Sequence, residues 1–188
     1  MDVVGCLCIG EITVGKRGFS DRFPFQRMEG VALRPCAPAQ GEAAWEGMQA
    51  ALQRVREEFG GASILAVGSG CFPALALSAQ LPVERLALIA PERAPYAFRR
   101  MERFARRNLS LCVCDILAVD GEACVPGLRA GGLGAHSRLT WLRLRGENGS
   151  KPLTDSKNAL DSAISCFLRT GELPKSLAEN REMCIIYG

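Results

Sequence analysis

The sequence predicts an α/β fold, a three-layer sandwich in which a mostly parallel central sheet lies between helices. Two periodicities alternate along the chain: short apolar runs typical of buried strands, and longer stretches with apolar residues every three or four positions, typical of amphipathic helices. Strands that alternate with helices of ten or more residues form βαβ units, whose strands run parallel. The length of 188 residues, 48% of them apolar and 23% charged, is that of one globular domain.

Each element of the first half has a local signal. The run from Val3 to Ile9 is β-rich and ends at Gly10, and a second short run covers 31–33 before two prolines. An apolar stripe from Trp45 to Phe59 predicts a helix over 42–59, which Gly60 and its neighbouring glycine end. We then expect a strand at 63–67, a glycine turn at 68–70, a helix at 73–80 with proline in its first turn, and a strand at 86–89.

The second half continues the alternation. We expect a helix over about 95–107, a strand over 111–119, a glycine-rich loop at 127–134, a strand at 139–144 and a last helix over 155–168. A final apolar piece covers 184–187. The core therefore spans about 3–170 in a single domain, and residues 171–188 form a tail.

Charge and composition restrict the partners and the compartment. The formal charge of +3 is too small to predict nucleic-acid binding. No apolar run reaches membrane-spanning length, and the amino terminus lacks the basic region of a secretion signal. The nine cysteines include no C-x-x-C pair, so we expect no metal site, and their apolar surroundings predict reduced thiols of a cytoplasmic protein. No motif predicts a cofactor or an oligomeric state, so the expected partner is a small-molecule ligand or a protein.

Ligands of parallel sheets bind at the carboxyl ends of the strands, here after Ile9, Val67, Ile89, Val119 and Leu144. The segment 64–91, with the turn Gly68-Ser69-Gly70 before a small-residue helix and a strand that ends in LIAP, resembles the α/β-hydrolase superfamily. Weaker similarity covers about 3–170. The run from Cys6 to Glu11, with Gly10, is similar to the family's first strand and oxyanion loop, and the segment 120–126 to its acid loop.

The resemblance implies that the usual catalytic triad is absent. The nucleophile position falls on Gly70, which we then expect to have a positive φ, and the next small-residue position is Phe72. The acid position falls on Cys124, and the loop 146–150 after the last strand holds no histidine. The single histidine, His136, precedes the strand 139–144 and so lies roughly 20 Å from the opposite edge.

Two unorthodox nucleophiles remain open. A shift of one residue places Ser69 at the turn, where Asp120, Glu122 or Glu147 would have to serve as its base. Alternatively the dipole of the following helix favours a thiolate at Cys71, although in the family this side chain points away from the pocket and its N–H serves the oxyanion hole. Either would make the protein an active acyl or ester hydrolase.

A second superfamily fits part of the same stretch. The Gly68-Ser69-Gly70 turn, with Glu92 beyond the next strand, resembles the glycine loop and ribose-binding acid of S-adenosylmethionine-dependent methyltransferases, but the third glycine is replaced by Phe72. Separately, five arginines on the helix 95–107 form a basic face, either simply solvated or able to attract an anionic ligand or an acidic partner. The favoured interpretation is a hydrolase-like protein without a triad that binds a ligand or partner.

Overall fold

A computed structural model describes residues 3–10, 28–36, 42–92, 99–119, 137–144, 157–179 and 183–187, with 125, 128 and 132–134 beside them. Seven strands form one sheet in the order β2-β1-β3-β4-β5-β6-β7. Their bounds are β1 Val4–Ile9, β2 Val31–Pro35, β3 Ser63–Val67, β4 Arg85–Ile89, β5 Asp115–Val119, β6 Leu139–Leu144 and β7 Met183–Tyr187. The first six strands run parallel, as predicted, and β7 pairs antiparallel with β6 at one edge.

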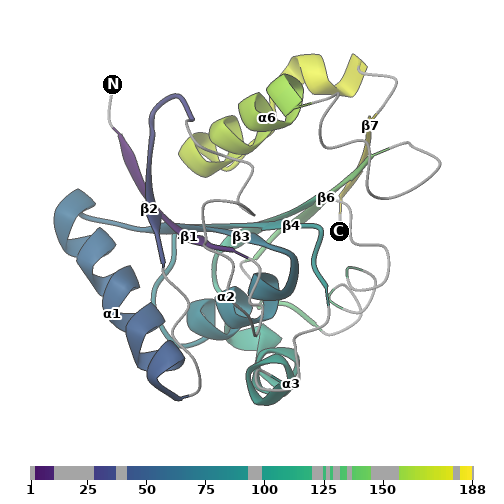
Figure 1. Cartoon of the computed structure of the whole chain (residues 1–188). Helices are drawn as coiled ribbons and strands as arrows, with labels where there is room; N and C mark the ends of the chain where they lie inside the picture. The colour runs from purple at the N-terminus through teal and green to yellow at the C-terminus, as the bar shows by residue number, and fades with distance from the viewer. Residues whose placement is uncertain are drawn as a thin grey trace.

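Helices cover both faces of this sheet, which makes the predicted three-layer sandwich (Figure 1). The helices α1 Glu42–Phe59, α2 Cys71–Ser78 and α3 Arg99–Arg107 lie on one face, and α6 Lys157–Thr170 lies on the other. Alternate residues of each strand point to opposite faces, so Ile64 and Ala66 of β3 join the core under α1 and α2, while Leu65 and Val67 join the core under α6. Because both faces are covered, the central strands are apolar throughout rather than alternating.

One predicted strand begins later than its sequence pattern indicates. The run 111–119 alternates in burial from its start: Leu111 and Val113 are 54% and 63% exposed, whereas Cys112 and Cys114 are buried. Yet the chain at Leu109–Leu111 forms a short 3-10 helix, η4, in which the Cys112 N–H donates to the carbonyl of Leu109. Strand pairing starts only at Asp115, because there the chain first lies beside β4.

The remaining differences are small shifts of helix ends. The helix expected at 73–80 is Cys71–Ser78, and that expected at 155–168 is Lys157–Thr170. The helix expected from 95 is described from Arg99 onward. None of the helices in the described ranges is long and apolar enough to cross a membrane.

Candidate functional site at the carboxyl edge of the sheet

The strand order places a topological switch point between β1 and β3. The chain passes outward from β1 to β2, and then crosses back to β3 on the other side of β1. At such a switch point the connections leave the two strands in opposite directions, and ligands of parallel sheets commonly bind there. The residues that follow β1 and β3, Gly10 and Gly68 to Gly70, therefore lie together as the sequence predicts.

The turn after β3 is a single 3-10 turn, η2, formed by Gly68–Gly70. Gly68 has a φ of +57°, a left-handed conformation that strongly favours glycine directly after a strand. Its carbonyl accepts the N–H of Cys71 and also, at 3.2 Å, the N–H of Glu92 from the connection after β4. These two bonds fix the turn against the neighbouring strand connection.

Gly70 has a different role from the one its sequence position suggests. Its φ is −72°, so the left-handed backbone lies two residues earlier, at Gly68. A Cβ on Gly70 would lie 2.4 Å from the carbonyl oxygen of Gly10 and 2.9 Å from that of Ile9. Because backbone atoms occupy this space, no larger residue fits here without displacing the end of β1. Gly70 is thus a packing position between β1 and α2.

Neither of the two candidate nucleophiles is exposed. Ser69, between the two glycines, is only 7% accessible. Cys71 is fully buried, and its thiol donates to the carbonyl oxygens of Ala66 at 3.5 Å and Ile89 at 3.6 Å. A thiolate has no proton for these bonds and would be desolvated, so the geometry holds Cys71 as a thiol that packs against the sheet.

Burial has the same effect on the pKa of four other thiols. Burial raises the pKa of the Cys6, Cys36 and Cys112 thiols, and raises that of Cys114 to about 12. Of the described cysteines, the seven at positions 6, 8, 36, 71, 112, 114 and 166 are free thiols. Across the described ranges, no three histidine, cysteine, aspartate or glutamate side chains are grouped as metal ligands would be. These cysteines therefore behave as small core residues.

The sequence analysis missed a strained residue at the same edge. Ala90, directly after β4, has a φ of +45°, and its N–H donates to the carbonyl of Val119 at 2.8 Å. A left-handed conformation is costly for alanine, and such strain persists only where the surroundings enforce it. The Ala90-Pro91 sequence carries no turn signal for this conformation, which asparagine or glycine would have indicated.

Several predicted site residues lie outside the described ranges. These are the oxyanion-loop residue Glu11, the acid-loop residues Asp120, Glu122 and Cys124, and the loop residue Glu147; His136 lies outside them too. The described part of the candidate site is therefore the switch point itself: Gly10, the Gly68-Ser69-Gly70 turn, Cys71 and Ala90.

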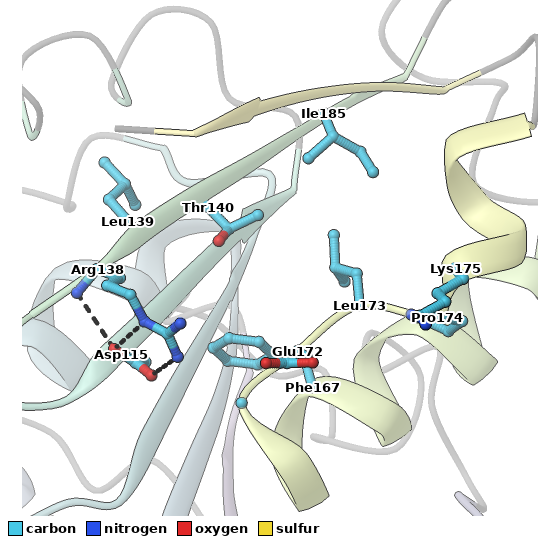
Figure 2. A pocket seen from close by; sticks show the side chains of 11 residues that line it. Asp115, Arg138, Leu139, Thr140, Phe167, Glu172, Leu173, Pro174, Lys175 and Ile185 are labelled. Carbon is cyan, nitrogen blue, oxygen red and sulfur yellow. Dashed lines mark hydrogen bonds and ion pairs between the residues drawn. The ribbon is translucent and has the colours of Figure 1, made fainter.

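A separate cavity of about 480 Å³ opens at the opposite, amino-terminal edge of β5 and β6. Figure 2 shows Asp115 and Arg138 joined at one end of it, with Phe167, Leu173 and Ile185 supplying apolar walls. Arg138 donates to Asp115 through Nη2 at 2.6 Å and through Nε at 3.2 Å. This fork holds the pKa of the Asp115 carboxyl below its ordinary value.

Asp115, Arg138 and the nearby Arg85 make contacts that stabilise the fold. Arg85, at the start of β4, donates to the last turn of α6 through the carbonyl of Leu168 at 2.9 Å, where a cation is favourable. Asp115 also feels the charge of Arg85, in addition to its bonds with Arg138. We therefore assign this cluster to holding the end of α6 against the starts of β4, β5 and β6. The sequence did not single out either residue as a site residue, because Asp115 lies within the expected strand 111–119 and Arg138 directly precedes the expected strand 139–144.

Two comparisons with known proteins leave the chain without an assigned family. No family model matches the sequence, and no curated protein matches it significantly.

Proposed function

We propose that this protein is a small α/β-hydrolase-like protein that has no catalytic triad and acts by binding a ligand or a partner. One observation carries the proposal: the left-handed residue at the turn from β3 into α2 is a glycine, Gly68. In the hydrolase family the nucleophile occupies a strained, sharp turn of this kind between strand and helix. The positive φ expected at Gly70 is wrong, since its φ is −72°, and the proposal therefore aligns the nucleophile position with Gly68 instead. Neither glycine has a side chain that could act as a nucleophile.

Ser69 is the remaining hydroxyl at this turn. It follows Gly68, and in the family the residue after the nucleophile supplies a backbone N–H to the oxyanion hole rather than a nucleophile. The low accessibility of Ser69 agrees with such a position. An active esterase that uses Ser69 is thus the rival hypothesis that the experiment must test.

The glycine turn also gives little support to a methyltransferase. In a nucleotide-binding glycine loop, the second glycine lets the ligand approach the backbone closely. Here the corresponding face of Gly70 is covered by the carbonyls of Ile9 and Gly10. Micromolar binding of S-adenosylmethionine in a calorimetric titration would overturn the proposal in favour of that function.

Turnover of p-nitrophenyl butyrate by the full chain tests the absence of catalysis. We expect rates at the level of a Ser69→Ala variant, and both at the level of buffer. The matched control is Ser78→Ala, which removes a buried hydroxyl of α2 that donates to the carbonyl of Leu75, away from the turn. Turnover that Ser69→Ala abolishes and Ser78→Ala retains would establish the esterase instead. A rise in melting temperature with a non-hydrolysed short-chain ester or carboxylate would support the binding role.

The compartment follows from the thiols. In the described part of the chain, seven cysteines form no disulfide and six of these are buried, which is typical of a protein that works in a reducing environment. We therefore propose a cytoplasmic location.

A further inference from the structure

The most unusual surface of the described molecule is one side of α3. Every exposed residue of this helix is an arginine, and each of its arginines is exposed. We call these five residues the arginine face: Arg99, Arg100, Arg103, Arg106 and Arg107. With Glu102 as the only acidic residue, the nine residues of α3 carry a formal charge of +4. The whole chain carries +3, so the rest of it is slightly acidic. The positive charge of the protein is thus gathered on one helix at its periphery (Figure 1).

The clustering of five arginines on one side of α3 destabilises the helix. Arg103 has an arginine at each of its four neighbouring positions on the helix surface, three and four residues before and after it. Like charges at these spacings repel each other. Arg99 and Arg100 also stand in the first turn, the end of a helix where positive charge is unfavourable. A solvated face that served only stability would not gather charge in this way, and local conflicts of this kind are expected at functional surfaces.

Arg106 has two contacts that place it in the fold. Arg106 pairs with Glu102 at 3.0 Å, and its guanidinium lies 4.5 Å from the centre of the Phe72 ring of α2. The ion pair lies within α3, whereas the contact with Phe72 joins α3 to α2 and so fixes the orientation of the arginine face. Within the described ranges, Arg100, Arg103 and Arg107 have no ion-pair partner. They follow each other at i, i+3 and i+7, a single stripe about 10 Å long.

We propose that the arginine face docks an acidic helical segment of a partner protein. A second helix with carboxylates at i, i+3 and i+7 repeats the axial spacing of Arg100, Arg103 and Arg107, so the three ion pairs form together. The arginine fork binds carboxylates in two-point contact, which lysine cannot do. The proposal rests on α3 alone and does not depend on the absence of catalysis at Gly68.

The size and surroundings of the face favour a protein over a larger polyanion. α3 is about 13 Å long, and a nucleic-acid duplex or a membrane surface would extend beyond it onto the slightly acidic rest of the molecule. The apolar side of α3, with Ala105 buried, faces inward and is not free to insert into a bilayer. Leu111 and Val113, just after the helix in and beyond η4, are two of the three large exposed apolar side chains among the described residues. Apolar side chains beside arginines are typical of protein interfaces.

The test uses a fluorescein-labelled, alanine-based helical peptide with glutamates at i, i+3 and i+7, titrated with the full chain at low salt and followed by anisotropy. We expect saturable binding that Arg103→Gln/Arg107→Gln weakens about tenfold, since two exposed charge pairs are lost. The matched control Arg54→Gln/Lys175→Gln removes two exposed cations elsewhere and should change the affinity less than about twofold.

Three results would overturn the proposal: no saturable binding, equal affinity for a peptide of the same composition whose glutamates are spread around the helix, or equal affinity of the two double variants. Tighter binding of phosphatidylserine vesicles or of a DNA duplex at the same ionic strength would assign the face to another class of partner.

A second double variant, Arg103→Lys/Arg107→Lys, serves if Arg103→Gln/Arg107→Gln unfolds, because it keeps the two positive charges and removes the guanidinium fork. It should bind more weakly than the wild type, and equal binding would again contradict the proposal. Ester turnover is unaffected by any of these outcomes, so the two proposals fail separately.

Discussion

Replacement of Gly70 by alanine tests whether this residue is a packing position. The new methyl group would lie 2.4 Å and 2.9 Å from two backbone oxygens and 3.0 Å from Cγ2 of Ile9. Overpacking of a core site costs typically about 1–3 kcal/mol. Because the close atoms here are backbone atoms at the end of a central strand, we expect the upper end, about 3 kcal/mol. For a domain of this size that loss lowers the melting temperature by roughly 6–12 °C.

Gly47 provides the matched control, because it lies in α1 and a Cβ there would meet no atom within 4 Å. Gly47→Ala should stabilise the protein by about 0.5–1 kcal/mol, since alanine has the higher helix propensity. Urea unfolding followed by circular dichroism measures both variants. A Gly70→Ala protein within about 0.5 kcal/mol of the wild type, a typical scatter for neutral substitutions, would refute the packing role and reopen Gly70 as a vacated functional position.

Three further substitutions have predicted outcomes. Ala90→Gly removes left-handed backbone strain of about 1–2 kcal/mol and adds an entropic cost of folding of about 0.5–1 kcal/mol. The free energy of unfolding measured in urea should therefore rise modestly, and a clear fall would contradict the strain at Ala90. Arg103→Gln relieves four repulsive pairs of about 0.2–0.5 kcal/mol each and should raise the melting temperature at low salt, with a smaller gain at high salt. Asp115 has a folded-state pKa below its ordinary value of 3.8 because of Arg138, so its stabilisation is present at neutral pH and is lost as the pH falls below that value. Acid titration of stability should therefore be flatter for Asp115→Asn than for the wild type, and parallel curves would show that the ion pair contributes nothing.

Much of the fold could be predicted from the sequence because its signals are local. The helix at 42–59 and the strands at 63–67 and 139–144 have the bounds that the sequence predicts, since apolar periodicity and the glycines after the helix mark them. The start of the strand expected from 111 was wrong for a non-local reason. Its alternation of exposed and buried residues begins at Leu111, the last residue of η4, and only the position of β4 decides where pairing begins.

The position of the glycine turn after β3 was predicted from the sequence, but the backbone conformation of its residues was not. Topology alone brings the ends of β1 and β3 together, so the glycine turn was found from the sequence. The packing of Gly70 against the end of β1 is a contact between Gly10 and Gly70, residues 60 positions apart in the chain, so no local sequence signal shows it. The left-handed Ala90 has no local signal either, because its conformation is fixed by bonding to β5 and by the chain that follows.

The central claim is that the turn after β3 presents no nucleophile. Its most direct test is incubation of the full chain with a fluorophosphonate probe, followed by intact-mass spectrometry and peptide mapping. The glycine at position 68 and the buried Ser69 predict no adduct, with a boiled sample of the same protein as the background. A stoichiometric adduct on Ser69 that is absent from the boiled sample would contradict the claim.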